Sequence, residues 1–279
     1  MEPFNKNSDL MIPFYIKNIV IPDNKPSSIA ILPAECGHYA RAAHLASELQ
    51  VPLAGENREE FKFLLICSAD SLDLIQTDNE KTGPIRSAFT DPKILYRLKH
   101  GGGRRQALAR AVGLKKKGWQ PRIIDATAGL GRDGFILAHL GCRVHLLERS
   151  PILTAMIKDG LRFAGRAAQT AETVSRIRIT QTDSIRYLQK LTEQNRPDVI
   201  YIDPMYPERT KSSLVKKEMR ILRTLVGDDQ DAPELLKTAL HFAVNRVVVK
   251  RPRLAPMLGG LEPSHAITGR TSRFDIYLV

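Results

Sequence analysis

Residues 123–134 read Ile-Ile-Asp-Ala-Thr-Ala-Gly-Leu-Gly-Arg-Asp-Gly, an apolar β-strand pattern that continues through a glycine-rich loop into a helix. The glycine spacing is Gly-x-Gly-x-x-Gly, which in a βαβ unit permits a tight turn and close approach of a ligand to the backbone. The next predicted strand ends at Glu148, 19 residues after Gly129. A carboxylate at that place can accept hydrogen bonds from both hydroxyls of an adenosine ribose.

Strand and helix patterns alternate from residue 121 to the C-terminus. The strand cores are continuous apolar runs, as expected of strands buried on both faces. This alternation predicts βαβ units and a mostly parallel, doubly wound α/β sheet. The predicted strands are 122–125, 143–148, 176–182, 198–203, 246–250 and 274–279, and the predicted helices are 134–140, 152–168, 185–193, 208–226 and 232–243.

Charge divides the chain into two parts. Residues 1–90 hold 8 Lys and Arg against 12 Asp and Glu, whereas residues 91–279 hold 34 against 18, so a region of net charge −4 precedes one of +16. A positive field of this size favours a polyanionic partner, most simply nucleic acid. We therefore expect a small mixed α/β domain over 1–90 and a larger domain over 91–279, with a basic, glycine-rich lead-in at 91–120.

The N-terminal part has strand patterns at 28–32 and 61–67 and a helical pattern at 38–49. No apolar run approaches the roughly 18 residues that a membrane span needs, and the first residues lack the pattern of a secretory signal. The three cysteines show no CxxC spacing. We expect a cytoplasmic protein without a membrane segment, disulfide framework or metal site, and we expect it to be a monomer.

The glycine-rich loop is compatible with two cofactor classes. A dinucleotide would place its pyrophosphate at the helix N-terminus, whereas S-adenosylmethionine would place its methionine part there. Asp125 at the strand end and Asp133 in the loop put negative charge beside the ligand, which suits an amino group and a sulfonium better than a pyrophosphate. Asp183 and Ser184, after the third strand, can bond an adenine amino group. We therefore expect S-adenosylmethionine, bound also by Gly129 and Gly131.

A second informative stretch is Asp203-Pro204-Met205-Tyr206, which follows the fourth strand of the alternation. Ligands of open α/β sheets bind beyond the carboxyl ends of the strands. A rigid turn there can hold the Asp203 carboxylate and the Pro204 carbonyl as acceptors for the two N–H groups of an exocyclic amine. Tyr206 can stack on the base that carries the amine. These three residues are the predicted catalytic residues, and catalysis would be mainly positioning.

This turn resembles the (Asn/Asp/Ser)-Pro-Pro-(Tyr/Phe/Trp) motif of amino-group methyltransferases, with Met205 in place of the second proline. Together with residues 125–134, 211–220, 247–252 and 273–277 it is similar to the RsmJ family of bacterial 16S rRNA guanine-N2 methyltransferases, and the similarity covers about residues 95–279.

The resemblance implies a Rossmann-like class I methyltransferase with a seven-stranded sheet, in which residues 266–271 pair antiparallel with the last strand. It implies S-adenosylmethionine as methyl donor and a guanosine near the 3′ end of 16S rRNA, free or in the 30S subunit, as acceptor. The cofactor contacts implied at matching positions are Arg132, Asp133, Glu148, Arg149, Asp183, Ser184 and Asp203.

Basic residues flank both informative stretches and can contact RNA phosphates, which would position the RNA without reading its sequence. Two of them follow three consecutive glycines, four follow the Asp-Pro-Met-Tyr turn, and two end the fifth strand. The predicted RNA-binding residues are Arg104, Arg105, Lys211, Lys216, Lys217, Arg220, Lys250 and Arg251.

Other functions remain open from the residues themselves. The acceptor could be adenine N6 in DNA or a protein side chain, although a protein acceptor would leave the positive charge without a purpose. A nicotinamide-dependent oxidoreductase would be stabilised by NAD and not by S-adenosylmethionine. A non-catalytic RNA-binding assembly protein would bind RNA equally well after Asp203→Ala and would transfer no methyl group.

Overall fold

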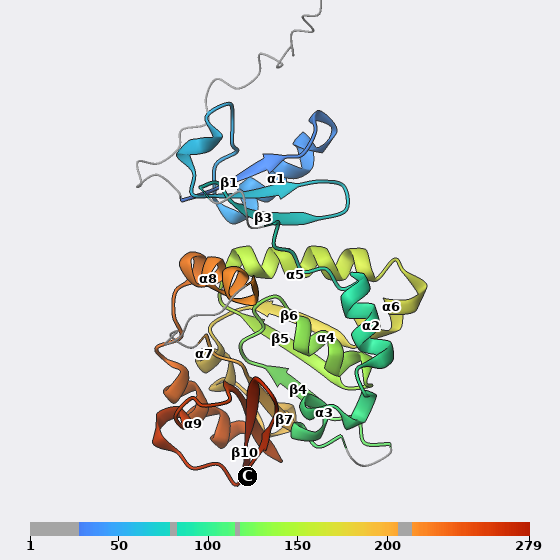
Figure 1. The fold of residues 1–279 in the computed structure, drawn as a ribbon, viewed down its shortest axis with the longest axis vertical. Helices are drawn as coiled ribbons and strands as arrows, with labels where there is room; N and C mark the ends of the chain where they lie inside the picture. The colour runs from blue at the N-terminus through green and yellow to red at the C-terminus, as the bar shows by residue number, and fades with distance from the viewer. Residues whose placement is uncertain (1–27, 79–82, 115–117, 206–213) are drawn as a thin grey trace, which may run out of the picture.

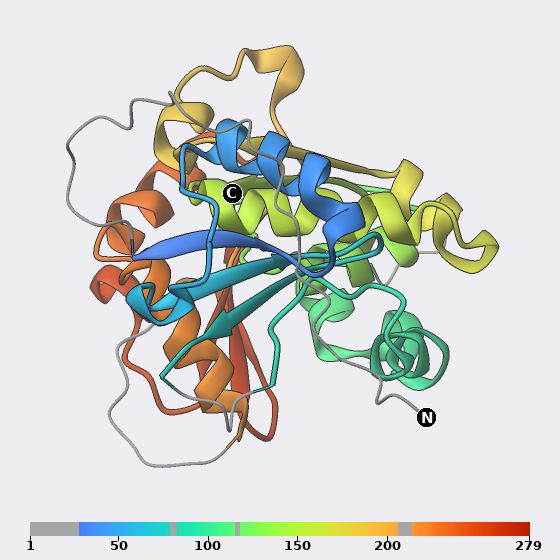
Figure 2. The same ribbon diagram turned by 90° about the horizontal axis from the view of Figure 1, so that it is seen from above.

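The computed structural model describes residues 28–78, 83–114, 118–205 and 214–279, which form two stacked parts (Figure 1). A small three-stranded sheet with one helix lies above a larger α/β sandwich, and helix α5 (Pro151–Ala164) lies between them. Figure 2, viewed from above, shows the small sheet lying over the large one. Within the described ranges, no helix combines the length and the apolar composition that crossing a membrane requires.

The small part is a β-α-β unit followed by a further strand. Strands β1 (Ile29–Pro33) and β2 (Phe63–Cys67) pair in parallel, and α1 (Tyr39–Leu49) connects them. Strand β3 (Leu72–Gln76) pairs antiparallel with β2. The predicted strands at 28–32 and 61–67 and the predicted helix at 38–49 correspond to β1, β2 and α1, whereas β3 was not predicted.

The large part contains a seven-stranded sheet of order β6-β5-β4-β7-β8-β10-β9. Strands β6 to β8 in this order are parallel, and β10 runs antiparallel to both β8 and β9. The predicted class I methyltransferase fold and its final antiparallel hairpin are therefore confirmed. The strands are β4 (Arg122–Asp125), β5 (Arg143–Glu148), β6 (Ile177–Gln181), β7 (Val199–Ile202), β8 (Arg246–Pro252), β9 (His265–Thr268) and β10 (Ser272–Leu278).

Successive residues of a strand point to opposite faces of the sheet, and in the central strands the residues on both faces are apolar. Both faces are therefore covered by helices. Ile123 and Val199 point into one cluster, together with residues of α3 and α4. Ile124 and Ile200 point into the other, together with α7 and α9. The remaining helices of the large part are α2 (Pro92–His100), α3 (Ala107–Ala111), α4 (Arg132–His139), α6 (Ala168–Ser175), α7 (Ser184–Leu188), α8 (Leu214–Val226) and α9 (Ala232–Phe242). Short 3-10 turns lie at Cys36–His38 and Arg58–Glu60 in the small part and at Gly103–Arg105, Glu193–Asn195 and Leu258–Gly260 in the large part.

The two parts share a hydrophobic core. The inner face of the small sheet packs against α5 and α8, so that neither part covers this apolar surface alone. Burial of such surface stabilises by about 25 cal/mol per Å². The fully or nearly buried members include Ile31, Leu65, Leu74, Leu130, Ile152, Met156, Ile221 and Leu222.

Candidate active site

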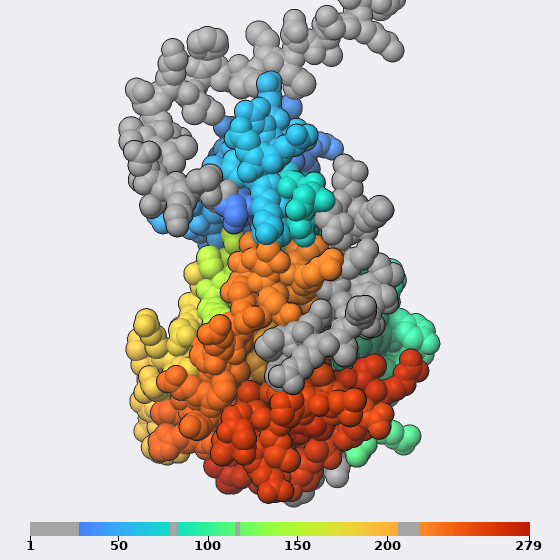
Figure 3. Space-filling model, turned by 60° about the vertical axis from the view of Figure 1, so that its left-hand side comes forward, coloured from blue at the N-terminus to red at the C-terminus, as the bar shows by residue number. Residues whose placement is uncertain are grey.

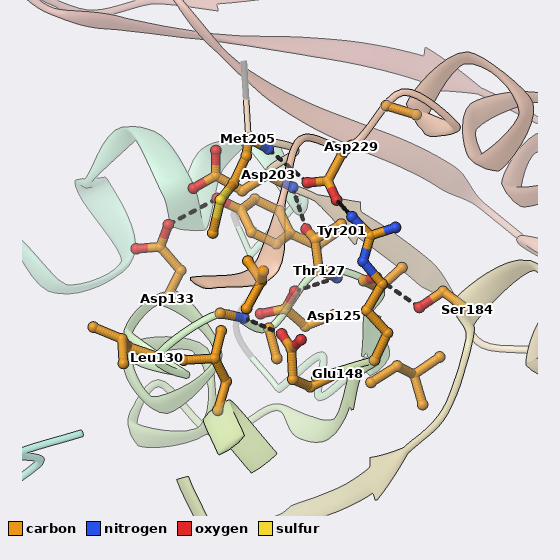
Figure 4. A pocket seen from close by; sticks show the side chains of 18 of the residues that line it. Asp125, Thr127, Leu130, Asp133, Glu148, Ser184, Tyr201, Asp203, Met205 and Asp229 are labelled. Atoms are coloured by element: carbon orange, nitrogen blue, oxygen red, sulfur yellow. Dashed lines mark hydrogen bonds and ion pairs between the residues drawn. The ribbon is translucent and has the colours of Figure 1, made fainter. Parts of the chain in front are cut away.

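The carboxyl ends of β4 and β7 border a cavity of about 430 Å³ at the middle of the sheet (Figure 4). In the sheet, β5 and β6 lie on one side of β4, and β7 and β8 lie on its other side. The cavity is therefore at the point where the strand order reverses. Open α/β sheets bind ligands at such a point. Both stretches singled out in the sequence, the glycine-rich loop and the Asp-Pro-Met turn, line this cavity.

The glycine-rich loop has the backbone conformation that its glycines permit. Gly129 (φ 56°) and Gly131 (φ 73°) are left-handed, a region that other residues seldom occupy. Gly131 is also the N-cap of α4, so the loop leads directly into the helix. Gly129 therefore lines the cavity with backbone alone, whereas Gly131 faces the core, where a Cβ would lie 3.1 Å from Phe89.

Glu148 at the end of β5 supports this loop from below. Its Oε2 accepts a hydrogen bond from Gly129 N at 2.9 Å, and its Oε1 accepts one from Ser150 N at 2.8 Å. Burial raises the pKa of the carboxyl, although both backbone N–H groups oppose that rise. A carboxylate offers about four acceptor positions, so Glu148 has capacity left for ribose hydroxyls at the cavity it lines.

Asp125 differs from its predicted role as a negative charge beside the ligand. The side chain is 2 % exposed, and its Oδ1 accepts a hydrogen bond from Thr127 N at 3.2 Å. Burial raises the pKa of Asp125 to about 8. Burial therefore favours the neutral form of this carboxyl over the charged form that the prediction assumed.

Lys250 joins the two stretches across the cavity. Its Nζ lies 2.7 Å from Asp133 Oδ2 and 2.8 Å from Asp203 Oδ2. The buried Tyr201 hydroxyl donates to the same Asp133 oxygen at 2.8 Å, and Arg97 of α2 lies 3.6 Å from the other. The ammonium of Lys250 is thus engaged by two carboxylates inside the site, and its contact with RNA phosphates stays a prediction.

These contacts divide the charges of the cluster unequally. Burial raises the pKa of Asp203, against the attraction of Lys250, and nearby Asp133 raises it further. For Asp133 burial acts in the same direction, but Lys250, Tyr201 and Arg97 together hold its pKa below the usual value. Burial lowers the pKa of Lys250, yet the two carboxylates outweigh it and raise that pKa. At neutral pH Lys250 is charged. Of the two carboxylates that it contacts, Asp203 takes up a proton more readily than Asp133.

The Asp-Pro-Met turn is held by residues from distant segments. Asp203 N donates to Thr127 Oγ1 at 2.6 Å, and Met205 N donates to Asp229 Oδ2 at 2.7 Å. Pro204 is buried, and Asp203 faces the cavity with 38 % of its side chain exposed. Tyr206, the third predicted catalytic residue, lies outside the described residues. Asp229 gave no signal in the sequence, because it follows a helix and belongs to no motif.

Four other predicted cofactor residues line the same cavity, and protein groups already contact each of them. Arg132 donates to both carboxylate oxygens of Glu218 of α8, from Nη1 at 3.0 Å and from Nη2 at 2.5 Å. Arg149 pairs with Asp229. Asp183 caps α7 by accepting from Arg186 N at 2.8 Å, and Ser184 Oγ donates to Ala126 O at 2.7 Å. The two acidic partners, Glu218 and Asp229, were not predicted.

The other predicted RNA-binding residues are in different environments. Arg105 and Arg220 are exposed, and Arg104 is half-buried with Nη2 3.5 Å from Leu140 O. Arg251 is only 2 % exposed and donates to Pro256 O at 3.0 Å, so the predicted contact with phosphate would require this side chain to leave its buried position. Lys211 lies outside the described residues, and the side chains of Lys216 and Lys217 in α8 are not described.

Comparison with known proteins agrees with this geometry. A family model described as "Putative SAM-dependent methyltransferase" matches residues 45–279. A ribosomal RNA small subunit methyltransferase J from Thioalkalivibrio sulfidiphilus is 52% identical over 238 residues, which are 85% of this chain and 92% of that protein. The protein of the same name from Pseudomonas aeruginosa is 45% identical over 249 residues, 89% and 93% of the two chains.

A solved structure is also similar over nearly the whole chain. The SAM-dependent methyltransferase NGO1261 from Neisseria gonorrhoeae is 34% identical, has a TM-score of 0.70, and covers 89% of this chain and 95% of its own. S-adenosylmethionine is therefore the cofactor of this methyltransferase. The chain belongs to the S-adenosylmethionine-dependent methyltransferases, in the family that carries the name ribosomal RNA small subunit methyltransferase J.

Proposed function

We propose that this enzyme methylates the exocyclic N2 amino group of a guanosine near the 3′ end of 16S rRNA, in the free RNA or the 30S subunit. Its relatives are named for small-subunit ribosomal RNA, and the described part of the chain carries exposed arginines, such as Arg105 and Arg220, for phosphates. The observation that carries the proposal is Asp203 at the cavity, with its carboxylate bonded by Lys250 and its backbone N–H bonded to the Thr127 hydroxyl.

The cavity residues divide into a donor side and an acceptor side. On the donor side, Glu148 has acceptor capacity for ribose, Asp183 and Ser184 are the proposed partners of the adenine amino group, and Gly129 supplies close backbone. Bound S-adenosylmethionine supplies an electrophilic methyl group on its sulfonium. A volume of about 430 Å³ is within the range of ligand pockets of this kind.

On the acceptor side, Asp203 and the Pro204 carbonyl accept the two N–H groups of the guanine amine. This arrangement directs the nitrogen lone pair at the methyl carbon, so that the C–N bond forms as the C–S bond breaks. The nitrogen becomes positive in this step and must lose a proton. Asp203, whose pKa is raised by burial, is the group placed to receive that proton and to release it to solvent.

We place the methylation in the cytoplasm, where ribosomal subunits are assembled, and expect the monomer to be the active form. The methyl transfer as proposed uses no metal ion. A change of acceptor, to adenine N6 for example, would keep the same donor side and alter only which base enters above Asp203.

The deciding experiment is transfer of labelled methyl groups to 30S subunits and to free 16S rRNA from a strain that lacks this gene. Digestion to nucleosides identifies the product. Label in N2-methylguanosine is expected, with none from the folded Asp203→Ala variant. Label in another nucleoside would refute the guanine assignment, and absence of label on either RNA, in a protein that binds S-adenosylmethionine, would refute RNA as the acceptor.

A further inference from the structure

The chain makes a tight turn directly after β8, and a leucine occupies its tip. Ala255 N donates to Pro252 O at 3.0 Å, which closes a β-turn with Arg253 and Leu254 at its two central positions. Leu254 is 92 % exposed, more than any other large hydrophobic side chain in the described ranges. Single exposed leucines are common on protein surfaces, so the exposure becomes informative only through the way this turn is held.

Arg273 of β10 fixes the turn from one side. Its Nη1 donates to Arg253 O at 3.1 Å and its Nη2 donates to Ala255 O at 3.0 Å, on either side of Leu254. Asp275, 1 % exposed, orients this guanidinium through contacts of 2.7 and 3.0 Å. The carbonyls that flank Leu254 are thus bonded to a side chain that is itself bonded to a buried carboxylate.

Arg251 fixes the same turn from inside. Its side chain is 2 % exposed and its Nη2 donates to Pro256 O at 3.0 Å. Arg251, which is costly to bury, and Arg273 together therefore hold three loop carbonyls. The consequence is that Leu254 is held outward and does not fold back onto the protein's own core.

The turn lies on the catalytic edge of the sheet. Strand β8 pairs in parallel with β7, so its carboxyl end, like that of β7, is at the cavity. Lys250, four residues before Leu254, bonds Asp203 at that end. Arg253 and Arg270, in the turn and in the β9–β10 loop beside it, are exposed. Figure 3 shows α8 in orange and the C-terminal segments in red on one face of the molecule.

We propose that Leu254 is a wedge that enters the RNA base stack beside the target guanosine and fills the gap left when that base enters the cavity. This inference rests on the proposed function. A stacked base cannot bring its amino group to a recessed carboxylate, so enzymes that modify bases extrude them. Apolar side chains on cationic surfaces are inserted between bases for this purpose. Arg253 and Arg270 supply the phosphate contacts that hold the RNA around it.

The test compares kcat/KM on 30S subunits and on two synthetic hairpins, one with the target guanosine stacked in a stem and one with it in a single-nucleotide bulge. On 30S subunits and on the stem, Leu254→Ala is expected to lower kcat/KM by about tenfold, since a leucine side chain loses its buried surface. On the bulge the loss is expected to be about twofold or less, because the base is already extruded.

Two further variants keep the result interpretable. Leu254→Phe also fills a stack and is expected to retain activity on all three RNAs. Val244→Ala removes an exposed apolar side chain before β8, at the opposite edge of the sheet, and is expected to change nothing. The affinity for S-adenosylmethionine should be the same in every variant.

Equal activity of Leu254→Ala and wild type on 30S subunits and on the stem would overturn the wedge. An equal loss on stem and bulge would also overturn it, since the leucine would then contribute affinity without regard to extrusion. Wild-type protein that labels none of these RNAs would overturn the proposed function itself, and the inference with it.

Discussion

Replacement of Lys250 by methionine tests the charge cluster most directly. Methionine keeps an unbranched side chain of similar length and removes the ammonium that lies 2.8 Å from Asp203 Oδ2 and 2.7 Å from Asp133 Oδ2. Lys250 is the strongest influence that opposes the burial-raised pKa of Asp203. Without it, that pKa rises further, and Asp203 is protonated at a pH where the wild-type carboxylate still accepts hydrogen bonds.

The size of the effect follows from the geometry. Two unit charges at this separation attract by about 1.5 kcal/mol at the dielectric constant of water and by about 6 kcal/mol at an effective value of 20. The side chains of Lys250 and Asp203 are 29 % and 38 % exposed, so solvent screens them and the lower part of this range applies. A loss of about 1.5–3 kcal/mol corresponds to a ten- to hundredfold lower kcat on the acid side of the profile.

The assay is single-turnover methyl transfer between about pH 6 and pH 9. Activity depends on ionised Asp203, so it is lost as pH falls through that pKa, and in Lys250→Met the loss should occur at higher pH and recover in alkali. Lys250→Arg keeps the charge and should resemble wild type more closely. Lys237→Met, on the exposed side of α9, is the matched control. A folded Lys250→Met protein with an unshifted acid limb would refute the reasoning.

Three further predictions concern the remaining groups of the site. Glu148→Gln should weaken S-adenosylmethionine binding about tenfold or more in calorimetry, because a charged acceptor is removed, while kcat at saturating cofactor changes little. The pKa of Asp125 is raised to about 8 in the folded protein and is about 4 in the unfolded chain. The free energy of unfolding of the wild type therefore falls by roughly 1.4 kcal/mol for each pH unit between these two values. Asp125→Asn should thus have a higher melting temperature than wild type at pH 7.5 and the same one at pH 4. The double variant Arg105→Gln and Arg220→Gln should reduce the logarithmic salt slope of the RNA KM by about one for each phosphate that the enzyme no longer binds, and an unchanged slope would place the RNA elsewhere.

The sheet was predictable because its strands obey a simple rule. Runs such as Val247-Val248-Val249 are apolar at every position, which fits only strands covered on both sides. Prediction failed where a strand lacks that pattern. β3 contains Asp73, which interrupts the apolar run and pairs with Arg86, an ion pair formed only after the chain folds back. The predicted helix 152–168 runs across the break between α5 and α6, and α6 itself was not predicted.

The site was predictable in its strand-end residues and not in its partners. Asp203 and Glu148 were found because the carboxyl ends of parallel strands meet at one edge. Lys250 and Arg251 are adjacent in a strand and look alike in sequence, yet one faces the carboxylates of the cavity and the other lies beneath a turn. Adjacent side chains of a strand point to opposite faces of the sheet. The two residues therefore differ in what packs on each face, which the sequence does not show.

The small N-terminal sheet has a structural link to the cofactor loop that composition does not reveal. The buried hydroxyl of Ser87, in the segment that leads from β3 to α2, donates to Leu130 O at 3.1 Å, in the middle of the glycine-rich loop. A Cβ at Gly160 of α5 would lie 2.0 Å from Ser87 O, so the segment and the helix meet at a distance that only glycine allows.

Phe89 continues this contact, because it stacks on Phe135 of α4 with ring centroids 4.5 Å apart. The domain boundary predicted at residue 90 thus falls inside continuous packing that begins in β1–β3 and ends at the cofactor loop. The negative N-terminal part need not contact RNA to affect catalysis. By filling the apolar faces of α5 and α8 and by bonding Leu130, it holds in place the glycine-rich loop, where we propose that the methyl donor binds.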